Sequence, residues 1–110
     1  MSTFVRAAAF NDVPKGGAIG VEVGGVDLAL VRDGDDVYAI HDECSHAEIP
    51  LSEGDVEGCE IECWLHGSRF DARTGAVLNL PATEPVAVYP CRREGDDVVV
   101  DVENPLPTPS

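Results

Sequence analysis

The sequence predicts an all-β protein, built as an antiparallel β sandwich or barrel. Short runs rich in Val, Ile and Tyr recur along the chain, and turns rich in Gly and Asp separate them. No stretch of 11 residues or more shows the period of an amphipathic helix. The 110 residues suffice for one domain with one hydrophobic core. Together these observations favour about eight short antiparallel strands.

The expected strands alternate with turn signals along the chain. Gly24-Gly25 is a hairpin signal between the first two runs, and the acidic turn at 33–36 precedes the third. Later turns are expected at 73–75 and 94–97, and a single turn of helix near 11–14. The runs expected to form strands are 21–23, 26–31, 37–40, 60–63, 68–72, 76–78, 86–92 and 98–102.

The middle of the chain differs from both ends. Residues 41–85 contain few long strands, whereas 1–40 and 86–103 have the pattern of ordinary β-sheet. We therefore expect a single domain over 1–103, in which a small subdomain at about 41–85 is inserted into a β base. The remaining residues, 104–110, are rich in proline, and we expect an extended, flexible tail.

Two short motifs in this middle stretch carry the chemistry of the chain. Cys44 and His46 form C-x-H, and Cys63 and His66 form C-x-x-H. Thiolate and imidazole ligands together indicate zinc or an iron–sulfur centre. Because each Cys has its own His beside it, the layout favours a binuclear cluster with two Cys on one iron and two His on the other. That is the ligand set of a Rieske [2Fe–2S] centre. Zinc in an interaction module is the alternative.

The charge of the chain restricts its partners. Asp and Glu number 21 against 7 Lys and Arg, which gives a net charge of −14. This charge repels phosphate and therefore disfavours nucleic acid and anionic membranes. It favours a basic protein partner, although acidity can also serve only to keep a small protein in solution. No apolar run reaches 18 residues and no targeting segment is visible, so we expect a cytoplasmic protein with no membrane span.

Around the two motifs the sequence resembles Rieske-type ferredoxins, the soluble electron carriers of multicomponent aromatic-ring dioxygenases. The likeness extends over nearly the whole chain and includes 11–16, 75–89 and 94–98. The sequence is also similar to ferredoxins encoded with actinobacterial iron–sulfur assembly machinery, and more loosely to the small subunit of assimilatory nitrite reductase. The resemblance implies a Rieske-like β base that holds a small cluster-binding subdomain.

The resemblance also implies roles for the matching positions. Cys44 and Cys63 would bind the inner iron of one [2Fe–2S] cluster per chain. His46 and His66 would bind the outer iron, near the surface. The stretch 80–82 would match the proline-containing loop that covers the cluster.

Four further positions bear on the reduction potential that the resemblance implies. Ser68 stands where the high-potential branch has a hydroxyl bonded to the cluster, but Phe70 stands where that branch has a Tyr hydroxyl. Ile49 and Leu65 replace the two additional cysteines of the respiratory branch, so no disulfide can clamp the ligand loops. We therefore expect a potential toward the low end of the Rieske range of about −150 to +300 mV.

The predicted function is one-electron transfer rather than catalysis. All four predicted ligands come from the protein, and the sequence shows no nucleophile–base pair, phosphate loop or open iron triad. The resemblance implies a flavin-dependent ferredoxin reductase as donor and a terminal oxygenase or another redox protein as acceptor. A permanently bound accessory subunit of a larger reductase is the alternative.

The remaining cysteines, the single tryptophan and one further histidine are assigned simpler roles. Trp64 either packs over the cluster or faces outward as a docking residue. Cys59 and Cys91 are expected to be small buried hydrophobic residues. His41 lacks a neighbouring Cys and is expected to be a structural or exposed histidine.

Overall fold

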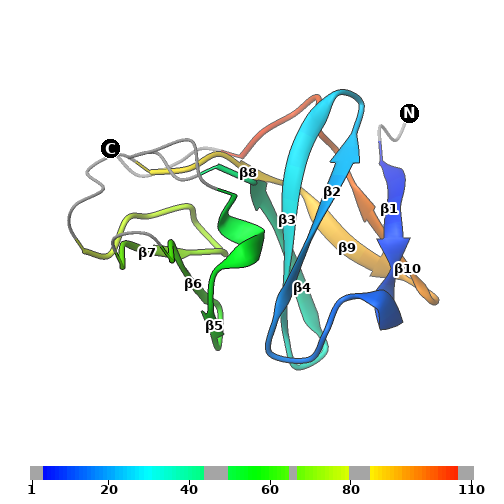
Figure 1. Ribbon diagram of the computed structural model, residues 1–110. Helices are drawn as coiled ribbons and strands as arrows, with labels where there is room; N and C mark the ends of the chain where they lie inside the picture. Colours follow the sequence, from blue (N-terminus) through cyan, green and yellow to red (C-terminus); the bar gives the residue numbers. More distant parts are fainter. Residues whose placement is uncertain (1–3, 44–49, 65–66, 80–84, 107–110) are drawn as a thin grey trace.

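The structure is a computed structural model that describes residues 4–43, 50–64, 67–79 and 85–106. It is nearly all β and contains three antiparallel sheets (Figure 1). We call the sheet with strand order β2-β3-β4-β8 the central sheet and the sheet with order β1-β10-β9 the outer sheet. These two form the base, and the third sheet, β5-β6-β7, forms a separate lobe beside it. The elements in chain order are β1 Val5–Ala9, η1 Phe10–Asp12, β2 Ala18–Val23, β3 Val26–Asp33, β4 Asp36–His41, η2 Leu51–Glu53, β5 Val56–Glu57, β6 Glu60–Glu62, β7 Arg69–Asp71, β8 Val88–Tyr89, β9 Cys91–Glu94 and β10 Asp97–Val100.

The central sheet begins with the hairpin that the sequence predicts. β2 pairs with β3 up to Val23 opposite Val26, and Gly24 and Gly25 form the turn with φ of 58° and 81°. A two-residue turn with positive φ at both positions is favourable for glycine and matches the twist of the flanking strands. β3 then pairs with β4 along its length, so β3 lies between two partners and is buried in its middle.

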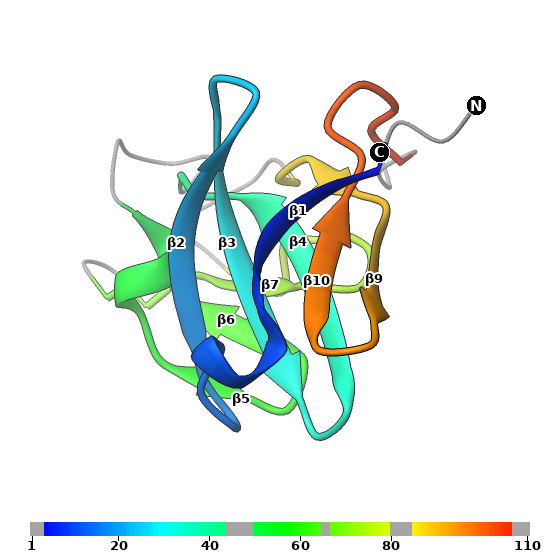
Figure 2. The same ribbon diagram turned by 90° about the vertical axis from the view of Figure 1, so that its right-hand side faces the viewer.

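The two faces of the central sheet belong to two different cores. In β3, Leu28 and Leu30 pack into the core of the base, whereas Ala29 and Val31 pack into the core beneath the lobe. Because successive side chains of a strand point to opposite faces, a continuous apolar run can serve both cores at once. The central sheet is therefore the common platform of base and lobe, as the end-on view in Figure 2 also shows.

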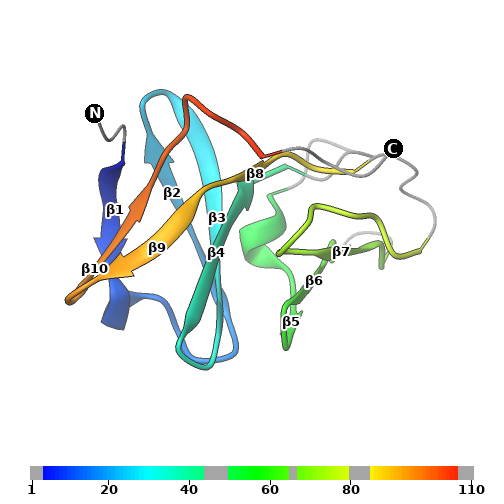
Figure 3. The same ribbon diagram turned by 180° about the vertical axis from the view of Figure 1, so that it is seen from behind.

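The outer sheet closes the base. β10 pairs with β1 on one side and with β9 on the other, and its Val98 and Val100 are buried against the central sheet. Phe10 is buried in the same core, and the guanidinium groups of Arg32 and Arg93 lie 4.2 and 3.9 Å from the centroid of its ring. The outer sheet lies on the side of the base that faces away from the lobe (Figure 3).

The predicted fold class is confirmed, with corrections at the level of single strands. Residues 76–78 form only an isolated bridge, Val77 opposite Phe70, rather than a strand. The run at 86–92 is interrupted at Pro90, which cannot donate a ladder hydrogen bond, so β8 and β9 join different sheets. The helical turn expected near 11–14 lies at Phe10–Asp12, one residue earlier. β1 and β5 were not predicted. None of the described helical segments is long and apolar enough to span a membrane.

The sequence predicts a flexible tail from Asn104 onward, but the structure holds the first part of this segment against the fold. The buried carboxylate of Asp101 accepts hydrogen bonds from the Glu103 amide at 3.0 Å and from Asn104 Nδ2 at 2.8 Å. The Leu106 amide then donates to the Val88 carbonyl at 2.7 Å, which attaches this segment to β8. Residues 104–106 are thus fixed by hydrogen bonds, and the rest of the predicted tail, 107–110, lies outside the described residues.

Candidate metal centre

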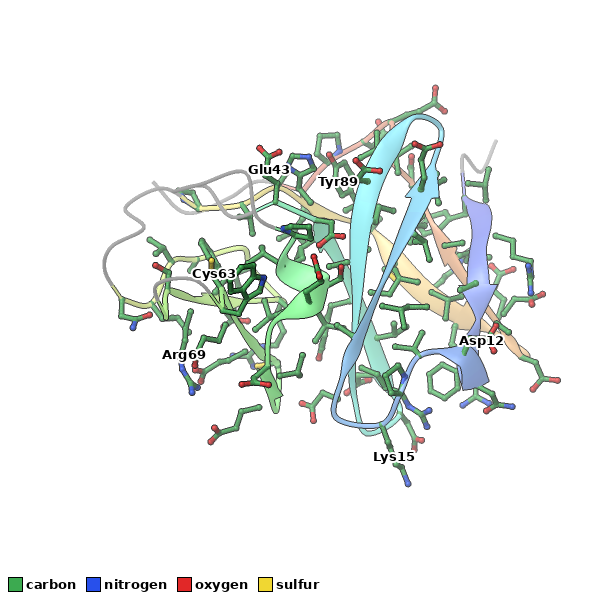
Figure 4. The ribbon with its side chains drawn as sticks, in the orientation of Figure 1. Asp12, Lys15, Glu43, Cys63, Arg69 and Tyr89 are labelled. Atoms are coloured by element: carbon green, nitrogen blue, oxygen red, sulfur yellow. The ribbon has the colours of Figure 1, made fainter. Side chains whose placement is uncertain are left out.

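The structure describes one of the four predicted cluster ligands. Cys63 lies directly after β6, and its side chain is fully buried (Figure 4). Cys44, His46 and His66 lie outside the described residues, as does the predicted covering loop at 80–82. The segments on either side of these positions are described, and they show how the two ligand loops are held.

The second ligand loop is a tight turn closed by its own backbone. The Cys63 amide donates to the Ser68 carbonyl at 2.7 Å, and the Gly67 amide donates to the Cys63 carbonyl at 2.9 Å. Gly67 has a φ of 79°, which a residue with a side chain adopts only at a cost. The turn therefore brings the backbones of Cys63 and Ser68 together.

Ser68 and Phe70 form the inner wall of this turn. Both side chains are fully buried, and Phe70 belongs to the same core as Cys63, Ile61 and Leu51. Leu51 follows the first ligand loop, so this residue and the predicted ligand Cys63 share one hydrophobic core. Phe70 contributes apolar contact in this core and, lacking a hydroxyl, no hydrogen bond.

Side-chain hydrogen bonds close both loops. Around the first loop, Asp42 accepts from the Ser52 amide and from Ser52 Oγ, both at 2.7 Å. At the second loop, Asn79 Oδ1 accepts from the Arg69 amide at 2.6 Å, and Asn79 Nδ2 donates to the Gly67 carbonyl at 3.1 Å. No signal in the sequence identified these residues, because none belongs to a recognised motif.

The surface of the lobe is acidic but contains one arginine network. Arg69 Nη1 lies 3.7 Å from Glu57 Oε2 and 3.5 Å from Glu60 Oε1, and Arg69 Nη2 lies 3.1 Å from Glu62 Oε2. One guanidinium is thus shared by three carboxylates, and the group stays net negative. Residues 41–85 carry ten of the 21 acidic residues of the chain against two arginines, so the side of the molecule that holds the predicted ligands is strongly negative.

The comparisons with known proteins identify the family. The family described as "Rieske [2Fe-2S] domain" matches residues 3–90, most of the chain. The chain belongs to the Rieske [2Fe–2S] domain family. It is 39% identical over 99 residues to the ferredoxin component of a naphthalene 1,2-dioxygenase system from Pseudomonas aeruginosa, covering 90% of this chain and 95% of the relative.

Solved structures of Rieske ferredoxins have the same fold. The ferredoxin of carbazole 1,9a-dioxygenase from Nocardioides aromaticivorans IC177 matches with a TM-score of 0.85 and 44% identity, over 90% of this chain and 97% of that one. The ferredoxin in a complex of reduced oxygenase and oxidised ferredoxin of carbazole 1,9a-dioxygenase matches with a TM-score of 0.82 and 34% identity, over 92% of this chain and 94% of that one. This Rieske protein is therefore an electron carrier of the ferredoxin type that uses one [2Fe–2S] cluster, and is not itself an enzyme. The family match also decides against zinc.

The described residues fit such a cluster. A buried thiol at Cys63 lies in a lobe whose interior is apolar, and a thiolate there is favourable only with a cation such as iron beside it. Thiolate and imidazole donors suit the two irons of a Rieske cluster.

Trp64 follows the predicted ligand Cys63, and its side chain is exposed. Its side chain is 54% exposed, and the side chain of Leu78, whose amide donates to the Arg69 carbonyl at 2.8 Å, is 47% exposed. Of the two interpretations of Trp64, this exposure favours a docking residue over a packing residue. Both are exposed apolar side chains on the otherwise acidic lobe.

The other cysteines and His41 take no part in the described site. Cys59 and Cys91 are free and only partly buried, whereas the sequence predicts small buried hydrophobic residues at both positions. Burial raises the pKa of Cys91 to about 12, and burial together with the charge of Asp71 raises the pKa of Cys59. His41 is partly buried at the end of β4, where its amide donates to the Ala87 carbonyl at 2.9 Å.

Proposed function

We propose that Cys44, His46, Cys63 and His66 hold the Rieske cluster, with the two cysteines on the buried iron and the two histidines on the iron nearer the surface. The buried position of Cys63 in the lobe supports this assignment. When bound, the cluster takes up and gives away one electron at a time. Two neutral imidazoles in place of two thiolates reduce the negative charge of the ligand set, which makes uptake of an electron easier.

We further propose that the acceptor is a terminal oxygenase of a dioxygenase system and the donor a flavin-dependent ferredoxin reductase. The likeness to a ferredoxin solved in complex with its oxygenase is the observation that carries this proposal. The curated relative is also the ferredoxin component of a dioxygenase system. We place the protein in the cytoplasm, where thiols such as Cys59 and Cys91 stay reduced.

The lobe is the surface that we propose for docking. Its exposed Trp64 and Leu78 supply apolar contact beside the second ligand loop, and the surrounding carboxylates attract a basic partner. In this arrangement residues 1–103 form one domain, with the cluster-binding subdomain at about 41–85. The separate three-stranded sheet β5-β6-β7, which falls within these bounds, supports the division.

Substitution of the ligands tests the proposal. The purified protein should contain two irons and two acid-labile sulfides per chain. Cys63→Ser should lose both, whereas Cys91→Ser, at a free cysteine of the base, should keep both. A Cys63→Ser protein that is folded and retains a full complement of iron and sulfide would refute the ligand assignment.

The partner proposal is tested separately with wild-type protein. Stopped-flow mixing of the reduced ferredoxin with an oxidised terminal oxygenase of an aromatic-ring dioxygenase should show electron transfer. Trp64→Ala should slow association without changing the reduction potential. If no such oxygenase accepts electrons from the wild-type protein, the proposed acceptor is wrong even if the ligand assignment holds.

A further inference from the structure

We infer that Asp42–Ser52 and Asn79 are two polar clamps that position the loops carrying the cluster ligands, in a protein that lacks the disulfide used by the respiratory branch. The inference rests on the proposed ligand set, because it assigns Cys44 and His46 to the first loop and Cys63 and His66 to the second.

The first clamp closes the first ligand loop at its base. Asp42 and Ser52 lie on either side of the stretch that carries Cys44 and His46. The two carboxylate oxygens of Asp42 bind the amide and the hydroxyl of Ser52, each at 2.7 Å. Hydrogen bonds to an ionised carboxylate are shorter and stronger than those between neutral groups, and two parallel bonds also fix orientation.

The clamp is itself anchored to the central sheet. The Asp42 amide donates to the Asp27 carbonyl at 3.0 Å, and η2, which contains Ser52, packs on β2 and β3. Figure 1 shows η2 between the central sheet and the lobe. The rigid hairpin of the base therefore determines where the first ligand loop starts and ends.

Gly20 in β2 leaves the space that the first clamp occupies. A Cβ at this position would lie 2.8 Å from Ser52 Oγ and 2.9 Å from Asp42 Oδ2. Real Cβ atoms do not approach polar atoms this closely, so any other residue would displace the clamp. The φ of Gly20 is not positive, which means that close approach, and not backbone conformation, requires glycine here.

The second clamp closes the second ligand loop. Asn79 Oδ1 accepts from the Arg69 amide, and Asn79 Nδ2 donates to the Gly67 carbonyl. The Asn79 side chain therefore connects the two residues on either side of Ser68. The Gly67 carbonyl is one residue beyond the proposed ligand His66. Asn79 also precedes the predicted covering loop at 80–82, so this single side chain connects the second ligand loop with the start of the stretch expected to cover the cluster.

These clamps differ from a disulfide in that they open reversibly. Asn79 is exposed and Ser52 partly exposed, so water competes for their hydrogen bonds. Loop opening exposes the cluster ligands, and the rate of cluster loss therefore depends on how often the clamps open. Removing a clamp should accelerate cluster loss and also change the environment of the cluster.

The test compares Asn79→Ala, Ser52→Ala and Gly20→Ala in the cluster-loaded protein with Asn11→Ala as control. Asn11 is an exposed asparagine beside Asp12, at the end of the base opposite Cys63 (Figure 4). We expect cluster loss to an iron chelator to be about fivefold faster in each clamp variant, consistent with loss of one or two hydrogen bonds, and unchanged in the control. Ser52→Ala keeps the backbone bond and provides a mild variant should Gly20→Ala fail to fold.

Two further measurements distinguish a role in positioning the ligand loops from an effect on the stability of the whole protein. The EPR g values and the reduction potential should shift in Asn79→Ala while the midpoint of thermal unfolding of the base stays close to that of the wild type. Asn79→Asp keeps the acceptor for the Arg69 amide but not the donor for Gly67. Amide hydrogen exchange at Arg69 should therefore remain slow in Asn79→Asp and become fast in Asn79→Ala.

The inference is overturned if all clamp variants lose the cluster at the wild-type rate, or if their g values and potential are unchanged. This outcome differs from failure of the ligand assignment, which appears as retention of the cluster in Cys63→Ser whatever the clamp variants do.

Discussion

The base and the lobe of this Rieske protein bury similar side chains but are held together in different ways. In the base, β2, β3 and β4 are six to eight residues long and pair along their lengths. In the lobe, β5, β6 and β7 are only two or three residues long, and its second ligand loop is closed by a few hydrogen bonds from backbone and side chains. The difference shows that the base supplies the rigid platform, whereas the lobe depends on the shared core, the clamps and the cluster.

The strongest test of this contrast is removal of the cluster. Metal binding contributes folding free energy where the apo site has few other interactions, so the lobe should lose its order and the base should not. We expect amide exchange in β6 and β7 to accelerate by at least about 100-fold in the apoprotein, with β3 and β4 little changed. Uniform acceleration across both regions would show that base and lobe unfold as one unit.

The reduction potential tests whether the inner wall of the lobe adjusts the cluster. Ser68→Ala removes the one hydroxyl at this wall and should lower the potential by roughly 40 mV, because a hydrogen bond of about 1 kcal/mol to the reduced form is lost. Phe70→Tyr should raise it if the fully buried ring tolerates the hydroxyl. Protein film voltammetry measures both shifts. A wild-type potential in the upper half of the Rieske range would mean that donors other than these two dominate.

Carboxylates of the two regions should differ in their effect on electron transfer. Replacing Glu43, Glu48 and Glu53 beside the first ligand loop with Gln should slow association with a basic partner by about tenfold at low salt. Replacing Asp33, Asp35 and Asp36 at the far turn of the base with Asn removes the same charge. At physiological ionic strength this second change should have a smaller effect than the first, because charges beyond the Debye length of about 8 Å are screened. Stopped-flow rates that respond equally to both sets would indicate attraction by net charge alone.

The smallest expected difference between base and lobe is in the alkylation rates of their free cysteines. Cys59 lies in the lobe and Cys91 in the base, where burial raises the pKa of Cys91 to about 12. Since the thiolate is the reactive form, Cys91 should be alkylated more slowly than Cys59 at pH 8. Mass spectrometry of the cluster-loaded protein after iodoacetamide treatment shows which of the two cysteines is alkylated first. Faster labelling of Cys91 would mean that the outer edge of the base opens more readily than the lobe.

The base was easier to predict from the sequence than the site. Gly24-Gly25 identifies its hairpin because few other residues adopt positive φ at both turn positions. β1 was missed because its register depends on β10, at the other end of the chain, rather than on a local turn signal. The two ligand motifs were recognisable because their residue types restrict the chemistry. Asp42, Ser52 and Asn79 were not, because their roles arise only when distant segments meet.

The central claim is that two histidines and two cysteines hold the cluster in the lobe. Pulsed EPR of the reduced protein tests it most directly, because nitrogen nuclei bound to the reduced iron couple to the electron spin. We predict two strongly coupled imidazole nitrogens together with a rhombic signal of low average g. A signal with no strongly coupled nitrogen, as expected for four thiolate ligands, would contradict the account.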